Sequence, residues 1–343
     1  MEFLDDSISK VISLGSIESN NEVLHIAYGI DRNFLFGAAV SMQSIVMNNL
    51  SLGMVFHLFT DYVDDNYLDR LDLFVRNNQN IQIHVYKVSR GFIDILPSLK
   101  QWSYATFFRL IAFQYLSGSI DKVLYIDADV ICKGSLNYFL TIELEKNIYA
   151  AVIKDVPFMQ DKPANRLGID GLPGNYFNAG VVYLKLEVWK QNDFLKKSIA
   201  MLASDPEHKK YKCLDQDILN ILFFEHCVFI SGDYDCFYGI DYELSNDSDQ
   251  NYKMIITNDT KLIHYVGVTK PWNNWTNYPC QKFFNDAYKI SFWNDISYVP
   301  ATTESQLYIK YRHEWKKSSY YSAFISFLRY YEKKIKRKYF HRK

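Results

Sequence analysis

The sequence predicts an α/β fold with a mostly parallel central sheet, helices on both faces of that sheet and a helical appendage at the C-terminus. Two observations support this prediction. Apolar stretches of strand length alternate with amphipathic stretches of helical length through most of the chain, which is the pattern of repeated βα units. The apolar residues 123–126 also run directly into Asp127 and Asp129, as expected where a buried parallel strand reaches a ligand-binding edge.

The composition is that of a globular protein with a large core. The chain has 343 residues, of which 48% are hydrophobic and 22% charged, and most of its 27 Tyr and 24 Phe are expected in the core. No apolar run approaches the roughly 20 residues of a membrane span, and the acidic residues 1–6 do not resemble a signal peptide. Five cysteines without a C-x-x-C pair indicate reduced thiols. We therefore expect a cytoplasmic protein.

The first half of the chain reads as βα units after a loosely packed lead-in over residues 1–22. The expected elements are strand 24–30, helix 34–47, strand 54–60, helix 64–77 and strand 81–88. At the first turn, Asp31 and Asn33 can reach a nucleotide base or ribose, and capping of the helix is an equally good explanation for Asn33.

The middle of the chain continues the alternation. We expect helix 102–116, strand 149–155, an irregular lid over 157–174 rich in Pro and Gly, strand 176–184, helix 186–202 and a further helix near residue 215. Arg109 either reaches the surface or faces an anion. Asn178, Ala179 and Gly180 form either a close backbone approach to a ligand or a β-bulge. Asp215 or Asp217 can cap its helix, although two acids flanking one Gln exceed what a cap needs.

Asp127 and Asp129 are candidate metal ligands. Side chains two apart on a strand point the same way, and two converging carboxylates are costly unless a cation lies between them. Near residue 264 a further strand delivers His264, and a turn containing Gly267 then presents Lys270. Two carboxylates and a neutral imidazole suit Mn²⁺ and leave positions open for phosphate oxygens.

Two other functions are consistent with parts of this pattern. In an aspartyl phosphohydrolase Asp127 would be the nucleophile, with Asp233 and Asp235 as a second acidic pair. That hypothesis leaves the segments around His264 and Asn178 unexplained. A membrane-docked scaffold without activity is the other alternative, and the presence of all three candidate metal ligands argues against it.

Six segments in this order resemble the family 8 retaining glycosyltransferases: residues 27–34, 105–109, 123–130, 177–183, 214–220 and 264–272. The resemblance covers about residues 24–275. Within the family, the chain is most similar to bacterial lipopolysaccharide outer-core α-glucosyltransferases and α-galactosyltransferases. This resemblance implies a GT-A type, Rossmann-like catalytic domain over residues 23–275. It also implies a UDP-sugar donor, a lipopolysaccharide core acceptor and Mn²⁺, with Mg²⁺ as the alternative ion.

The same resemblance implies a role for each matching residue. Asp127, Asp129 and His264 would be metal ligands. Ala128 would line the donor site, Gly267 and Lys270 would hold the diphosphate, and Gly29, Asp31, Asn33 and Phe34 would surround the uridine. Arg109, Asp155, Asn178, Ala179, Asp215 and Gln216 would hold the donor sugar. Asp155, Asp215 and Gln216 are the candidate catalytic residues, with Gln216 nearest the reacting carbon. Because an amide is a poor nucleophile, we expect Gln216 to stabilise positive charge rather than to attack.

Residues 276–343 are expected to form a helical, basic, membrane-associating region. Ten basic residues lie from Lys316 onward against Glu332 alone, although the whole chain has a net charge of only −1. Apolar side chains from position 320 to 335 recur at helical spacing, which favours a helix in the interface of an anionic membrane. We therefore expect a peripheral protein on the inner face of the inner membrane, and no nucleic-acid partner.

Overall fold

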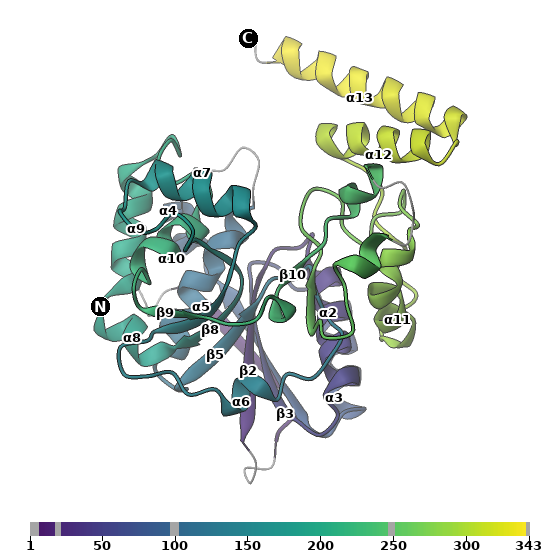
Figure 1. Cartoon of the computed structure of the whole chain (residues 1–343). Coiled ribbons are helices and arrows are strands. Elements are labelled where there is room, and N and C mark those ends of the chain that lie inside the picture. Colours follow the sequence, from purple (N-terminus) through teal and green to yellow (C-terminus); the bar gives the residue numbers. More distant parts are fainter. Residues whose placement is uncertain (1–6, 18–21, 97–102, 246–250, 341–343) are drawn as a thin grey trace.

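The computed structural model describes residues 7–17, 22–96, 103–245 and 251–340. Its centre is an eight-stranded sheet with the order β1-β4-β3-β2-β5-β8-β7-β9 (Figure 1). These strands are β1 (Ile8–Leu14), β2 (Val23–Ile30), β3 (Gly53–Thr60), β4 (Ile81–Val88), β5 (Lys122–Ile126), β7 (Ala150–Lys154), β8 (Phe177–Lys185) and β9 (Cys227–Phe229). Strands β1 and β8 run opposite to the other six, which confirms the mostly parallel sheet.

Helices cover both faces of this sheet, as predicted. The α-helices are α2 (Leu35–Asn48), α3 (Asp65–Arg76), α4 (Arg90–Ile95), α5 (Phe108–Leu116), α6 (Tyr138–Thr141), α7 (Pro157–Leu167), α8 (Leu186–Gln191), α9 (Phe194–Ser204), α10 (Asp215–Leu222), α11 (Lys282–Ile290), α12 (Glu304–Lys316) and α13 (Tyr320–Phe340). Short 3₁₀ helices are η1 (Tyr104–Phe107), η2 (Gly232–Tyr234), η3 (Ile240–Leu244), η4 (Asn251–Met254) and η5 (Pro279–Gln281). In Figure 1, α2, α3 and α11 lie on one side of the sheet and α5, α8, α9 and α10 on the other.

Successive side chains of each buried strand point to opposite faces of the large sheet, so the protein has two hydrophobic cores, one on each face. Every residue of β3 is buried. Phe56 and Leu58 pack in the cluster that contains Val40 of α2, whereas Phe59 packs in the cluster that contains Ile111 of α5. Successive side chains of a strand point to opposite faces, so a strand covered on both sides reads as one continuous apolar run.

The strand order places a ligand-binding edge between β2 and β5. From β2 the chain passes to β3 and β4 on one side, and β5 then pairs with β2 on the other side. In open α/β sheets, ligands bind at the carboxyl ends of strands where the order reverses in this way. Asp31 follows the end of β2 and Asp127 follows the end of β5, so the two acids share this edge.

A second, three-stranded sheet joins distant segments beside this edge. It has the order β10 (Cys236–Phe237), β11 (Leu262–His264) and β6 (Val130–Cys132). The strand that runs into the two acids therefore ends at Ile126, and Val130 begins a strand in the other sheet. His264 lies opposite Val130 in the antiparallel β11–β6 pair, which brings His264 next to Asp129.

Four local expectations need correction. Residues 8–14 of the expected lead-in form β1, which pairs with β4 at the sheet edge. Residues 157–167 of the expected irregular lid form α7, with Pro157 in its first turn and Pro163 inside it. The helix expected over 186–202 is two helices, because Asp193 has a left-handed backbone (φ 51°). Neither Asp215 nor Asp217 makes a side-chain cap to α10, which is preceded by Leu214 with φ 54°.

The C-terminal region divides into two parts. Helix α11 packs against α2, and its Phe284 is fully buried in the main core. Helices α12 and α13 pair with each other and project from the rest of the chain (Figure 1). In the part of the chain that the structure describes, no helix combines the length and the apolar character needed to span a membrane.

Candidate active site

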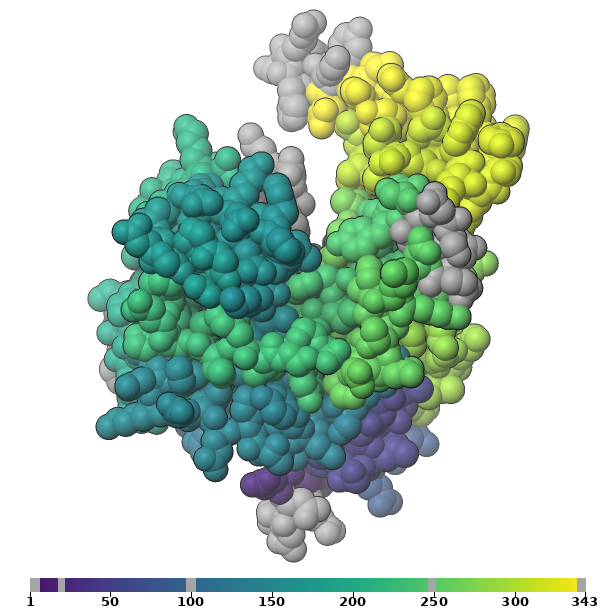
Figure 2. Space-filling model, in the orientation of Figure 1, coloured from purple at the N-terminus to yellow at the C-terminus, as the bar shows by residue number. Residues whose placement is uncertain are grey.

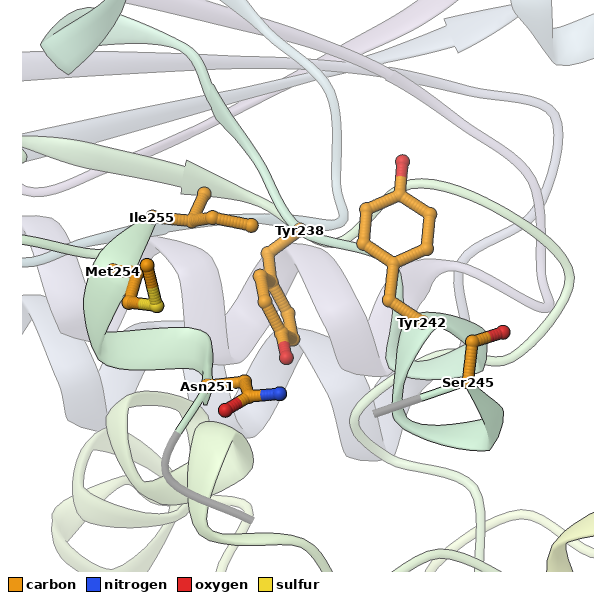
Figure 3. Close-up of a pocket in the computed structure, with 6 residues that line it drawn as sticks. All are labelled: Tyr238, Tyr242, Ser245, Asn251, Met254 and Ile255. Atoms are coloured by element: carbon orange, nitrogen blue, oxygen red, sulfur yellow. The ribbon is translucent and has the colours of Figure 1, made fainter. Parts of the chain in front are cut away.

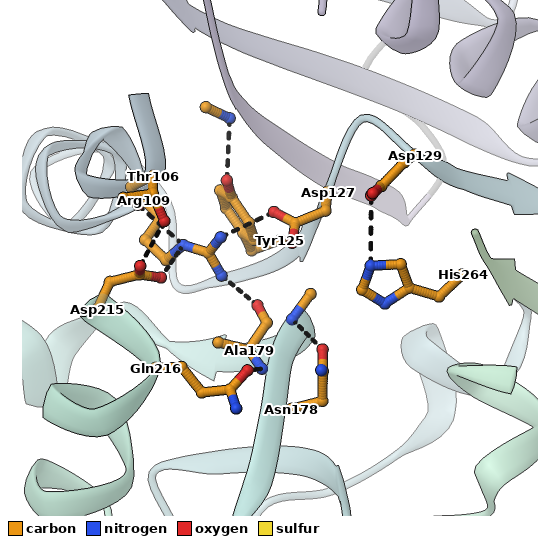
Figure 4. Close-up of polar contacts among 12 residues, drawn as sticks. Thr106, Arg109, Tyr125, Asp127, Asp129, Asn178, Ala179, Asp215, Gln216 and His264 are labelled. Carbon is orange, nitrogen blue, oxygen red and sulfur yellow. Dashed lines mark hydrogen bonds and ion pairs between the residues drawn. The ribbon is translucent and has the colours of Figure 1, made fainter. Parts of the chain in front are cut away.

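Asp127, Asp129 and His264 converge on one point. Their ligand atoms lie within 4.8 Å of one another, so the group can hold a metal ion. His264 Nε2 lies 3.3 Å from an Asp129 carboxylate oxygen (Figure 4). Asp129 and His264 are buried, whereas the Asp127 side chain is 28% exposed and offers an open side of the group to a ligand.

Lys270 completes the charge pattern around Asp129. Its Nζ donates to Asp129 Oδ2 at 2.5 Å and to the Tyr265 carbonyl at 3.0 Å. Burial opposes ionisation of Asp129, but the charges of Lys270 and His264 outweigh it and lower the pKa of this carboxyl. The same acid, together with Asp235, raises the pKa of His264 against the opposing effect of burial. Asp129 is therefore held as a carboxylate by its contacts with Lys270 and His264.

The turn that carries Lys270 is held by the backbone conformation of Gly267 and by a hydrogen bond from the Lys270 N–H. Gly267 has φ +96°, a left-handed conformation that favours glycine. The Lys270 N–H donates to Asn273 Oδ1 at 2.6 Å, and Asn273 is buried. These contacts direct the lysine ammonium group towards the acids.

Arg109 faces anions and does not reach the surface. It is 4% exposed, and its guanidinium lies 2.8 Å from Asp127 and 2.8 Å from Asp215 (Figure 4). It also donates to the Ala179 carbonyl and stacks 4.4 Å from the centre of the Tyr125 ring. Arg109 thus holds together groups from β5, β8 and α10.

Gln216 is oriented by two hydrogen bonds. Its Oε1 accepts from the Ala179 N–H at 3.1 Å, and its Nε2 donates to Asp155 Oδ2 at 3.0 Å. Asn178 donates to the same Asp155 oxygen at 3.3 Å. Burial raises the pKa of Asp155, and it raises that of Asp215 to about 6 against the nearby charge of Arg109. An amide and two carboxyls in partly apolar surroundings can therefore surround an uncharged, hydroxyl-rich ligand.

The two acids that flank Gln216 have separate partners. Asp215 pairs with Arg109, and Asp217 accepts from Arg166 of α7 at 2.6 Å. Asp217 also accepts from the Tyr176 hydroxyl at 2.7 Å. The helix that carries Gln216 is therefore attached through one acid to α5 and through the other to α7.

The residues expected around a nucleotide lie at the end of β2. Asp31 Oδ1 accepts from the backbone N–H groups of Asn33 and Phe34, so Asp31 forms the turn before α2. The Gly29 N–H donates to the Tyr125 hydroxyl at 3.2 Å. Phe34 meets Trp272 edge to face at 5.8 Å, and Ala128 is buried between the two acids.

A hollow opens between the part of the chain that holds α7 and the part that holds α12 (Figure 2). A separate pocket of about 450 Å³ lies between η3 and η4, and Tyr238, Tyr242 and Met254 help to line it (Figure 3). Burial and the charge of Asp155 both raise the pKa of Tyr242.

Sequence reasoning did not assign some residues that make close contacts here. Tyr125 lies in an apolar strand whose sequence gives no sign of a polar contact, and Thr106 donates to Asp215. The sequence suggests Asp235 only as part of a second acidic pair, but its carboxylate contacts His264 Nδ1 at 3.0 Å. Nothing in the sequence around Asp235 pointed to His264, because their contact depends on the pairing of β10 with β11.

Family models and known proteins both match this chain over most of its length. The family model "Glycosyl transferase family 8" matches residues 25–276, and the model of that family's C-terminal region matches residues 278–334. The chain is 38% identical over 320 residues to a lipopolysaccharide 1,2-glucosyltransferase of Escherichia coli K12, covering 93% of this chain and 94% of the relative. It is 34% identical over 318 residues to a lipopolysaccharide 1,3-galactosyltransferase of Salmonella typhimurium, covering 92% and 93%.

A solved structure shares the fold. The galactosyltransferase LgtC, solved with donor and acceptor sugar analogues, aligns with a TM-score of 0.62 at 22% identity, covering 78% of this chain and 96% of LgtC. The structural match supports the GT-A fold, and the sequence matches extend over nearly the whole chain. This chain belongs to glycosyl transferase family 8 and is a sugar-transferring enzyme with a GT-A fold.

Proposed function

We propose that the protein transfers a hexose, with glucose favoured, from a UDP-sugar to the outer core oligosaccharide of lipopolysaccharide, with retention and an α-linkage. The main structural support is the group of Asp127, Asp129 and His264 with Lys270 beside it. The two relatives at 34–38% identity are a lipopolysaccharide glucosyltransferase and a lipopolysaccharide galactosyltransferase, which supports lipopolysaccharide as the class of acceptor. Because one of them transfers galactose, UDP-galactose is the alternative donor.

In this proposal the acids and His264 hold Mn²⁺, or Mg²⁺ in its place. Three carboxylate and imidazole ligands within 4.8 Å fit such an ion. When bound, the ion neutralises the negative charge that grows on the departing diphosphate. Lys270 adds a second positive charge to the same group, and Gly267 lets the backbone turn there.

The remaining residues would bind the two ends of the donor. Gly29, Asp31, Asn33, Phe34 and Ala128 would contact the uridine part. Arg109, Asp155, Asn178, Ala179, Asp215 and Gln216 would hold the sugar. Positive charge develops on the sugar ring as the bond to the diphosphate lengthens, and the Oε1 of Gln216 can stabilise it. The departing phosphate oxygen can accept the proton of the acceptor hydroxyl, so no side chain need be a strong base.

The phosphohydrolase alternative receives no support from the position of its second acidic pair. Asp233 is half-buried and accepts from the Ser231 hydroxyl, and Asp235 contacts His264. The ion-pair partner of Asp127 is Arg109. The observed contacts are better explained by a metal and diphosphate site.

Donor scanning tests the substrate proposal. Purified protein is incubated with UDP-glucose, UDP-galactose and other UDP-hexoses, each with Mn²⁺ and a set of truncated core lipopolysaccharides. We expect UDP release that is strongly accelerated by one particular core structure, and fastest release with UDP-glucose. Release with UDP-galactose alone would change the donor assignment and leave the class of enzyme unchanged.

Gln216→Ala should lower kcat by about 10²-fold, because it removes a group that acts mainly on developing charge. UDP affinity should change less than threefold, since the Gln216 contacts are with Ala179 and Asp155. Steady-state kinetics and calorimetric UDP binding measure the two quantities. Gln191→Ala on α8 is the control and should match wild type. An equal loss of UDP affinity would place Gln216 in the nucleotide pocket instead.

We propose further that residues 276–343 attach this catalytic domain, residues 23–275, to the anionic inner face of the inner membrane. One face of α13 packs on α12 through Ala323, Ser326 and Phe327. The other face exposes apolar side chains, which are Tyr321, Phe324, Leu328, Tyr331 and Ile335. An amphipathic helix with such a stripe and basic residues at its end suits a membrane interface.

The paired substitution Phe324→Ser with Leu328→Ser should lower sedimentation with anionic liposomes at least tenfold. Both side chains are about half exposed (58% and 48%), so the change removes little packing. Leu50→Ser, which alters an exposed apolar residue between α2 and β3, is the matched control.

Deleting residues 319–343 should abolish the sedimentation, and high salt should weaken it for the intact chain, while hydrolysis of the UDP-sugar continues. Unchanged liposome binding by the deleted chain would show that α13 is only a packing helix of the hairpin.

A further inference from the structure

The imidazole of His264 is held on three sides by parts of the chain that are distant in sequence. Its Nε2 points to Asp129, and its Nδ1 lies 3.0 Å from Asp235 Oδ1. The pairing of β10 with β11 places Phe237 beside His264, with ring centres 5.9 Å apart. A fixed ring is needed because a histidine binds a metal through a single nitrogen whose direction is set by the ring.

The contact with His264 is the main interaction that accounts for the burial of Asp235. It is 1% exposed, and its Oδ1 meets His264. Its other oxygen, Oδ2, is buried with no hydrogen-bond partner among the described residues. A buried carboxylate with one unsatisfied oxygen is costly, which makes a purely structural role a poor explanation.

Gly180 on strand β8 limits the position of the His264 ring from the other side. A Cβ added to Gly180 would lie 2.3 Å from His264 Cε1 and 2.8 Å from Nδ1, closer than real contacts allow. The small residue in this segment is therefore used for a close approach to an imidazole. Gly180 lies on β8, so the ring is held between the large sheet and Asp235.

We propose that Asp235 is a positioning residue for the metal site: it accepts the Nδ1–H of His264 and so directs the Nε2 lone pair to the point that Asp127 and Asp129 face. This inference rests on the proposed function, because it assumes that the three residues bind a metal ion. Carboxylates that accept from metal-binding histidines fix both the tautomer and the ring direction, and their loss weakens metal affinity about 10–100-fold.

The test measures Mn²⁺ affinity and needs no turnover. Free Mn²⁺ is followed by electron paramagnetic resonance during titration of the full chain with saturating UDP present. Wild type, Asp235→Ala, His264→Ala and the double variant form one cycle. Asp233→Ala, two residues away and bonded to Ser231 rather than to His264, is the matched control and should bind as wild type. Circular dichroism shows whether each variant is folded.

We expect Asp235→Ala to bind Mn²⁺ 10–100-fold more weakly, and the double variant to bind no more weakly than His264→Ala alone, since Asp235 acts through that ring. Asp235→Asn keeps the shape and an acceptor oxygen, and should recover most of the affinity even if the Ala variant does not fold. Gly180→Ala should also weaken Mn²⁺ binding, because the added Cβ would displace the His264 ring. Unchanged affinity in Asp235→Ala, or additive losses in the cycle, would overturn the role of Asp235. If Asp235→Ala does not fold, a folded Asp235→Asn that binds Mn²⁺ no more tightly than His264→Ala would overturn it. Wild type without measurable Mn²⁺ binding would instead overturn the proposed metal site.

Discussion

Replacing Asp129 by Asn is expected to lower sugar transfer by three or more orders of magnitude while the fold is retained. Asn has nearly the same shape as Asp but cannot carry the negative charge that Lys270 and His264 surround. A metal clamp contributes several kcal/mol to the charged transition state, and each 1.4 kcal/mol is about tenfold in rate. Transfer of labelled hexose at saturating donor measures the loss, and Asp127→Asn should behave in the same way.

The control for this prediction is Asp121→Asn, which alters an exposed acid just before the same strand, β5. It should keep wild-type transfer, and circular dichroism should show that all three variants are folded. Near-normal turnover in Asp127→Asn or Asp129→Asn would rule out a metal held by these carboxylates.

Replacing Arg109 by Met is expected to lower the free energy of unfolding by about 3–5 kcal/mol, because it leaves Asp127 and Asp215 without their shared cation. Urea denaturation measures this. Arg76→Met is the matched control, since Arg76 pairs with Asp72 on an exposed helix face and should cost less than about 1 kcal/mol.

The pH dependence of the Arg109→Met variant gives a second check. The pKa of Asp215 is already raised to about 6 by burial, and losing the arginine should raise it further. The folded state then binds a proton more readily than the unfolded state, so the variant loses stability as the pH rises from about 4 through the folded-state pKa. The destabilisation relative to wild type should therefore be largest at neutral pH and shrink towards pH 4. A destabilisation that is independent of pH would mean that lost packing, and not the unpaired acids, is its cause.

Elements with strong local signals could be predicted from the sequence. The βα alternation and the apolar residues 123–126 predicted the parallel strands because burial on both faces leaves a continuous apolar run. Strand β1 was missed because an edge strand such as Ile8–Leu14 is buried weakly and lacks clear alternation. Pro157 and Pro163 predict an irregular segment where α7 forms, although proline is favoured in the first turn of a helix.

The candidate site was predictable where its residues end strands, and less so where it depends on contacts between segments. Asp127, Asp129 and His264 were expected together and do converge. The choice between surface and anion for Arg109 needed the structure, which buries it against Asp127 and Asp215. The partner of His264 could not be predicted, because Asp235 reaches it only through the three-stranded sheet.

The most direct test of the proposed reaction is the anomeric configuration of the first product. The protein is incubated with UDP-glucose, Mn²⁺ and a truncated lipopolysaccharide core that accepts sugar, and the new linkage is read by proton nuclear magnetic resonance. A retaining transferase predicts one new α-linked hexose for each UDP released. A β-linked product, or release of inorganic phosphate without any new glycosidic bond, would contradict it.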